Sequence, residues 1–157
     1  ELEQAAEAYR TILMAGGPSA ETQFALADLL YRSGDLSAAR ERYYAALETY
    51  EQFVEARVSL GCLLAEQGDA QLAIAAFEGA LSQHPDYADA HYHLAGVWDR
   101  LGCANEASRH YREFLALAPD SAWAGAAKDL LQQQASSAEG GLNPPTASSE
   151  ALSETTH

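Results

Sequence analysis

Apolar and small residues recur along most of this chain at the spacing of amphipathic helices. Leu26 and Leu30 are four residues apart, as are Ala39 and Tyr43, so each pair lies on one face of a helix. A glycine, Gly34, separates the two pairs. The pattern predicts two amphipathic helices joined by a short turn.

The same pair of helices recurs every 34 residues without an insertion. Gly34, Gly68 and Gly102 stand one period apart, and glycine adopts the left-handed conformation that ends a helix at little cost. We therefore expect each of them at the turn inside a helix pair. Further positions that match at this period are Leu26, Leu60 and Leu94; Leu30, Leu64 and Trp98; Ala39, Ala73 and Ala107; Tyr43, Phe77 and Tyr111; and Leu47, Leu81 and Leu115.

The residue after each glycine predicts how well the next helix begins. Asp35 and Asp69 can cap that helix through a side-chain oxygen, which is typically worth about 1 kcal/mol. Cys103 caps poorly, so we expect the third turn to be the softest. Small residues should allow the two helices of each pair to approach closely. They are Ala27, Gly61 and Ala95 in first helices and Ala39, Ala73 and Ala107 in second helices.

This 34-residue frame resembles the tetratricopeptide repeat. The resemblance implies an all-α fold, a right-handed α-solenoid of antiparallel helix pairs that forms a TPR-like superhelix. Residues 1–17 resemble the second helix of a truncated repeat, and residues 122–135, with Ser121 as cap, resemble the helix that closes such arrays. We expect a TPR domain over 1–135, with full repeats at 20–53, 54–87 and 88–121 and a disordered tail over 136–157, which has few apolar residues.

Composition and charge narrow the partners of this segment. The net charge is −14 with a single lysine, Lys128, so nucleic-acid binding is disfavoured because phosphate contacts need clustered Lys and Arg. No apolar run approaches the roughly 20 residues that span a bilayer. Two cysteines argue against a disulfide framework and favour a reducing, cytoplasmic location. A basic or neutral protein partner fits this charge, although surface acid also serves solubility.

The resemblance also implies a binding surface, because first helices line a concave groove in this family through four positions each. The implied lining mixes carboxylates with aromatic side chains and suits a short peptide that is basic and partly apolar. The alternative is that the aromatics pack on neighbouring second helices and the acids form a solvated face. The groove residues are Glu21, Phe24, Asp28 and Tyr31; Glu55, Val58, Cys62 and Ala65; Asp89, Tyr92, Gly96 and Asp99; and Trp123 from the closing helix.

One known subclass of the family is disfavoured by these residues. Some members hold the C-terminal carboxylate of heat-shock chaperones with Lys, Asn and Arg. The matching positions here are Phe24 and Asp28, then Ser59, then Asp89 and His93. The sequence therefore lacks the basic clamp, and its acids would repel that ligand.

Catalytic, metal and cofactor motifs are missing from the sequence. His91 and His93 are about 200° apart around a predicted helix, so one metal ion cannot be chelated by both. His84 and His110 belong to other helices. Neither cysteine has a basic sequence neighbour that would lower its thiol pKa. We therefore expect no catalytic residue, no metal, no cofactor and no enzyme.

The sequence thus favours a protein-interaction module, a scaffold or adaptor that binds a peptide in its groove. The alternative is the sensory or interaction region of a larger bacterial regulator, with an N-terminal effector or DNA-binding domain outside this chain. The run that begins at Asp86 is similar to the C-terminal part of bacterial repeat proteins, some of which carry a DNA-binding domain of the MerR type. Self-association through the N-terminal helix, around Leu2, Tyr9 and Leu13, is a further expectation.

Overall fold

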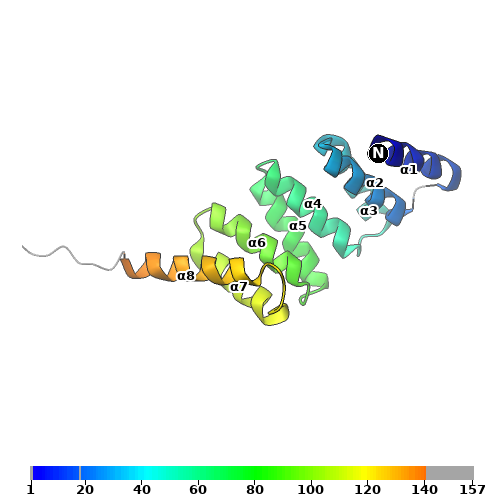
Figure 1. Ribbon diagram of the computed structural model, residues 1–157. Helices are drawn as coiled ribbons and strands as arrows, with labels where there is room; N and C mark the ends of the chain where they lie inside the picture. Colours follow the sequence, from blue (N-terminus) through cyan, green and yellow to red (C-terminus); the bar gives the residue numbers. More distant parts are fainter. Residues whose placement is uncertain (1, 18, 141–157) are drawn as a thin grey trace, which may run out of the picture.

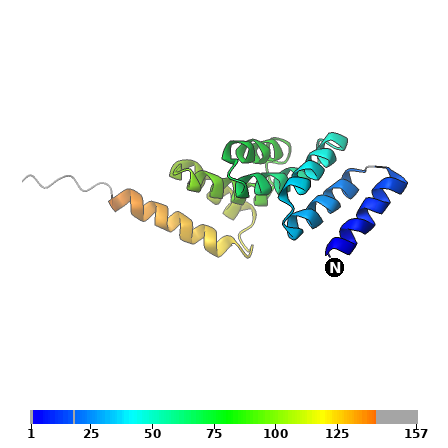
Figure 2. The ribbon, with the colours of Figure 1, turned by 90° about the horizontal axis from the view of Figure 1, so that it is seen from above.

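The computed structural model describes residues 2–17 and 19–140, and the described part is an open array of eight helices packed in adjacent pairs (Figure 1, Figure 2). This confirms the predicted all-α, TPR-like fold. Each helix packs chiefly on its neighbours in sequence. The helices are α1 (Leu2–Gly16), α2 (Ala20–Ser33), α3 (Leu36–Thr49), α4 (Val54–Glu66), α5 (Ala70–Gln83), α6 (Ala88–Arg100), α7 (Ala104–Leu117) and α8 (Ala124–Gly140).

The three glycines of the 34-residue frame end the first helix of their units as predicted. Gly34 and Gly68 have φ of 86° and Gly102 has φ of 75°, in the left-handed region that favours glycine. The Gly34 amide donates to carbonyls in the last turn of α2, which closes that helix. The repeated turn therefore has a local cause in the sequence.

The predicted helix caps differ from unit to unit. Asp35 Oδ1 accepts a hydrogen bond from the Ala38 amide at 3.1 Å and caps α3. The cap predicted at Asp69 is wrong, because this side chain makes no such hydrogen bond and its carboxylate lies 3.7 Å from the Arg40 guanidinium. Cys103 makes no side-chain cap either, as expected. Of the three turns, only the one before α3 provides a side-chain hydrogen bond that caps the following helix.

The close approach inside each pair depends on small residues at the predicted places. Ala39, Ala73 and Ala107 are all fully buried. A Cβ added at Gly61 would lie 2.7 Å from Cε1 of Phe77, which is itself fully buried. The α4–α5 pair therefore packs more closely than even an alanine at this position would allow.

The last helix is longer than the sequence analysis predicts. It starts at Ala124 rather than directly after Ser121, whose Oγ instead accepts a hydrogen bond from the Trp123 amide in the preceding turn. Residues 136–140 continue the helix, although we expected them in the tail. The hydroxyls of Ser136 and Ser137 donate to carbonyls one turn earlier, which adds bonds within the helix. Residues 141–157 of the expected tail lie outside the described residues.

The length and polarity of the helices determine whether any of them could cross a membrane. None of the helices within residues 2–17 and 19–140 combines the length and the apolar character that a bilayer crossing requires.

Candidate functional site

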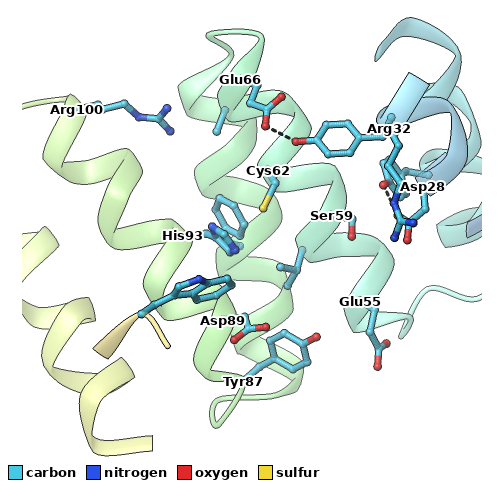
Figure 3. A pocket seen from close by; sticks show the side chains of 16 residues that line it. Asp28, Arg32, Glu55, Ser59, Cys62, Glu66, Tyr87, Asp89, His93 and Arg100 are labelled. Atoms are coloured by element: carbon cyan, nitrogen blue, oxygen red, sulfur yellow. Dashed lines mark hydrogen bonds between the residues drawn. The ribbon is translucent and has the colours of Figure 1, made fainter. Parts of the chain in front are cut away.

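The first helices α2, α4 and α6 line a pocket of about 590 Å³, which we call the first-helix groove (Figure 3). Its lining mixes charged, aromatic and small side chains, and the turn before α8 also contributes. The lining residues are Asp28, Tyr31, Arg32, Tyr43, Glu55, Val58, Ser59, Cys62, Ala65, Glu66, Phe77, Tyr87, Asp89, His93, Arg100 and Trp123.

Most of the groove residues named from the sequence lie together in this pocket. The reason is helical geometry, because positions three and four residues apart share one face of a helix. The period then places that face on the same side of α2, α4 and α6. The predicted residues that line the pocket are Asp28, Tyr31, Glu55, Val58, Cys62, Ala65, Asp89 and Trp123.

Two residues predicted from α2 do not line it. Glu21 is exposed in the first turn of α2, outside the pocket. Phe24 is half-buried, with its ring centroid 4.9 Å from that of Phe53 and 6.1 Å from that of Tyr43. Phe24 is therefore a packing residue within the first full repeat, as the alternative proposed for the aromatics.

Three residues predicted from α6 also lie outside the pocket. The Tyr92 ring stacks on Trp123 at 4.9 Å and contacts Phe114 at 5.0 Å. Asp99 accepts a hydrogen bond from Gln134 Nε2 of α8 at 2.8 Å. Gly96, the third, faces the Tyr111 hydroxyl instead. The structure thus uses Tyr92 and Asp99 to hold the C-terminal segment, which the sequence could not show because it depends on where α8 docks.

Two of the groove carboxylates are already engaged by tyrosines. The Tyr43 hydroxyl donates to Asp28 Oδ1 at 2.6 Å, and the Tyr31 hydroxyl donates to Glu66. Burial first, and then these hydrogen bonds, raise the pKa of both tyrosines above the usual value, so both remain protonated donors. Sequence analysis treated Tyr43 as a core residue and missed Glu66.

Within the described part of the chain, four other charged side chains of the groove form no ion pair and no side-chain hydrogen bond: Glu55, Asp89, Arg32 and Arg100. Tyr87 lines the same end of the pocket as the two acids, and burial first, then the charges of Glu55 and Asp89, raise its pKa. Figure 3 shows these three side chains at one end of the pocket, with Glu66 and Arg100 toward the other.

Several polar lining residues were not among the predicted site residues, and they include Arg32, Glu66, Tyr87 and Arg100. A signal for three of them was present, because Arg32, Glu66 and Arg100 stand 34 residues apart. Ser59 and His93 were considered only as clamp positions, and both line the pocket. The same period that located the groove could therefore have located its second charged edge.

Cys62 and His93 show what kind of chemistry the groove supports. Burial, with Glu66 and Asp89 nearby, raises the pKa of the Cys62 thiol to about 12, so it is protonated at neutral pH and a poor nucleophile. Burial lowers the pKa of His93, against the opposing effect of Asp89, so its ring is neutral. His93 stacks on Phe77 and meets the Trp123 edge at 5.4 Å. The groove presents contacts for binding.

Metal binding has no obvious centre in the part of the chain that the structure covers. Over residues 2–17 and 19–140, no three or more His, Cys, Asp or Glu side chains are grouped so that they could hold an ion.

Two further grooves lie between successive second helices and are equal in size, at about 350 Å³ each. The α3–α5 groove is mainly apolar, with Tyr44, Leu72, Ala75 and Ala76 in its lining. The α5–α7 groove is more polar, and its lining includes Glu78, Pro85, His91, Arg109 and His110.

The two buried histidines of the α5–α7 groove form one hydrogen-bonded chain. His91 Nε2 donates to the Pro85 carbonyl at 3.0 Å, so its Nδ1 accepts from His110 Nδ1 at 2.9 Å. His110 Nε2 then accepts from Arg109 Nη2 at 3.3 Å. The sequence analysis assigned these histidines to separate helices, and only the packing of α6 on α7 brings them together.

Comparison with known proteins supports the repeat pattern. Two family models, both described as tetratricopeptide repeat, match residues 1–56 and 64–136. Among curated proteins the sequence has no significant match.

Solved structures with the same fold are similar over most of the chain. The structure of MamA has a TM-score of 0.73 at 23% identity, and the match covers 89% of this chain and 90% of that one. YrrB, described as a TPR protein with an unusual peptide-binding site, has 0.74 at 24%, covering 82% and 66%. The Yersinia enterocolitica type III secretion chaperone SycD, in complex with a peptide of the translocator YopD, has 0.72 at 17%, covering 75% and 93%.

Proposed function

Because the chain belongs to the tetratricopeptide repeat family, we propose that it is a non-enzymatic interaction module that binds a short, basic and partly apolar peptide segment in the first-helix groove. The observation that carries this proposal is the pair of uncompensated carboxylates, Glu55 and Asp89, beside Tyr87 in a pocket with aromatic walls. Carboxylates beside an aromatic ring suit the charged end and the apolar stem of Lys or Arg.

The similar structures support the peptide part of this proposal. YrrB is described with a peptide-binding site, and SycD was solved with a peptide of its translocator. Peptide binding is therefore compatible with this fold in at least two proteins of similar architecture.

The charge of the whole molecule supports the basic character of the ligand. The chain carries −14 at neutral pH, and its field attracts cationic segments and repels anionic ones. The groove itself holds Asp28, Glu55, Glu66 and Asp89 against Arg32 and Arg100, so its lining is also net acidic. The net charge of the chain and the net charge of the groove lining therefore both favour a basic ligand.

The groove offers binding contacts without a catalytic arrangement. Its one thiol has a raised pKa, and its imidazole is neutral but stacked between rings. Two of its carboxylates accept from tyrosines. These groups support recognition rather than bond-making chemistry.

The test is capture of peptides from a random-sequence display library by the wild type and by the charge-reversal variant Glu55→Arg/Asp89→Arg. We expect the wild type to enrich Lys- or Arg-containing segments and the variant to lose them. Glu106→Arg/Glu113→Arg is the matched control, because it makes the same charge change at exposed positions of α7. Equal enrichment by the groove variant and the wild type would refute the proposal.

We also propose self-association through α1, where Ile12 is 54% and Met14 is 90% exposed. Of the residues predicted for this surface, Tyr9 packs against the core and contributes less than the sequence suggested, and the side chains of Leu2 and Leu13 lie outside the described part of the structure. SycD has been described in an alternative dimer. Light scattering at increasing protein concentration tests this, and a constant monomer mass, equal to that of Ile12→Ser/Met14→Ser, would contradict it.

A further inference from the structure

The charged residues of the first helices form two rows that follow the 34-residue period. The first row stands in the first turns of α2, α4 and α6 and consists of Glu21, Glu55 and Asp89. The second row stands at the ends of the same helices and consists of Arg32, Glu66 and Arg100. Glu55 and Asp89 of the first row lie at one end of the first-helix groove, and Glu66 and Arg100 of the second row lie toward the other end (Figure 3).

The rows differ in how far their charges are compensated. Acids near helix starts and bases near helix ends also interact well with the helix dipole, which explains part of the pattern. Glu66 departs from it, since it stands at a helix end and accepts from Tyr31. In the first row, Glu55 and Asp89 form no ion pair and no side-chain hydrogen bond within the described residues, and Tyr87 lies at the same end of the groove (Figure 3).

The spacing of the rows constrains a ligand that crosses the helices. The first helices α4 and α6 contact each other directly, and helices in contact lie about 8–10 Å apart, so equivalent side chains on α4 and α6 are roughly 10 Å apart. In a polyproline II segment every third side chain points the same way, at about 9 Å. Basic residues three positions apart therefore match the distance between the acidic side chains, whereas basic residues two or four positions apart do not.

We propose that the groove selects an extended peptide with Lys or Arg at positions i and i+3, placed on Glu55 and Asp89. Side chains that face the other row meet Arg32 and Arg100, so acidic or apolar residues are accepted there and basic ones are disfavoured. Trp123 and His93 provide the apolar wall between the rows. This inference rests on the proposed function and adds the spacing of the recognised residues.

The test measures fluorescence anisotropy with three labelled peptides of identical composition, in a proline-rich background, with two arginines at i,i+2, at i,i+3 or at i,i+4. We expect the i,i+3 peptide to bind the wild type most tightly, by roughly threefold or more, since one well-placed exposed ion pair is worth up to about a factor of five. Glu55→Gln and Asp89→Asn should each weaken that peptide and abolish the preference among the three spacings.

The control is Glu106→Gln/Glu113→Gln, two exposed acids on α7 that do not line the groove. It should lower all three affinities slightly and keep their order. If the three peptides bind equally well but groove variants weaken them all, the spacing inference is overturned and the proposed function stands. If no basic peptide binds the wild type, both fail. If the control weakens binding as much as the groove variants, the site does not lie between these rows.

Discussion

The α3–α5 groove and the α5–α7 groove are built one repeat apart from equivalent positions, and each has a volume of about 350 Å³. Most equivalent positions in their linings carry different side chains. Tyr44, Arg57, Ala75 and Ala76 line the first groove, and the residues 34 positions later, which line the second, are Glu78, His91, Arg109 and His110.

One interaction is common to both grooves although the residues differ. Arg57 Nη2 donates to the Glu51 carbonyl at 2.8 Å, and His91 Nε2 donates to the Pro85 carbonyl, at the positions one period later. The turn between repeats is therefore held by a side chain of the next first helix in both units. The backbone conformation and this hydrogen bond therefore recur with the 34-residue period, while the other side chains of the two grooves differ.

The largest effect is expected when one histidine is replaced by the residue of the other groove. His110→Ala, which copies Ala76, should lower the free energy of unfolding by roughly 2–4 kcal/mol, because it removes buried volume and leaves His91 Nδ1 without its donor. Denaturant unfolding monitored by circular dichroism measures this change.

The matched control completes the exchange. In His91→Arg/His110→Ala, the arginine can donate to Pro85 as Arg57 does to Glu51, so most of the lost stability should return. A double variant no more stable than His110→Ala would show that an arginine at position 91 does not replace the hydrogen bond from His91 to the Pro85 carbonyl.

Of the two grooves between second helices, acidification should weaken only the α5–α7 groove, which contains His91 and His110. Burial first, then His91 and Arg109, lower the pKa of His110 to about 4, while Glu78 lines the same groove. An unfolded histidine titrates near 6.5, so this stabilisation is complete above about pH 6.5 and is lost as the pH falls through about 4, by up to about 3 kcal/mol.

Thermal unfolding between pH 4 and pH 7 checks this sign. Other groups also titrate in that range, so the informative quantity is the difference between the wild type and His91→Arg/His110→Ala. The wild type should lose stability relative to this variant as the pH falls toward 4. A difference independent of pH would contradict the assigned protonation of the pair.

A smaller effect is expected where the two units differ inside the core. Gly61→Ala copies Ala95 of the next unit, yet the added Cβ would lie 2.7 Å from the buried Phe77 ring. The overpacking should exceed the roughly 1 kcal/mol gained from helix propensity and leave a net loss of about 1–2 kcal/mol. Calorimetry should show a lower melting temperature.

Gly96→Ala is the control for Gly61→Ala. Its added Cβ would meet only the Tyr111 hydroxyl at 3.9 Å, an ordinary contact, so stability should stay equal or rise by up to about 1 kcal/mol. A Gly61→Ala variant that melts at or above the wild-type temperature would show that Phe77 can move aside.

Periodic residues predicted the fold because their information is local. Gly34, Gly68 and Gly102 needed only their own backbone conformation to mark the turns, and they did so in every unit. The cap at Asp35 was equally local, but the one predicted at Asp69 was not, since the Asp69 carboxylate lies 3.7 Å from the guanidinium of Arg40 on α3, a helix of the previous repeat. Local signals were reliable where no side chain from another helix interfered.

The groove was partly predictable for the same reason. Asp28, Glu55 and Asp89 could be placed on one face from helical geometry alone. Tyr92 and Asp99 share that face, but they contact Trp123 and α8, whose docking is a long-range event. The groove residues available to bind a ligand are those whose side chains form no such internal contact.

The sequence by itself determined the array, its period and the side of each first helix that faces the groove, because these follow from propensity and spacing within about 34 residues. Only the tertiary structure decided which charges stay free and which are used. The Tyr43–Asp28, Tyr31–Glu66 and His91–His110 contacts each join different helices, and their partners are set by packing rather than by period. The repeat thus specifies a common scaffold, and the contacts between helices give each unit its own chemistry.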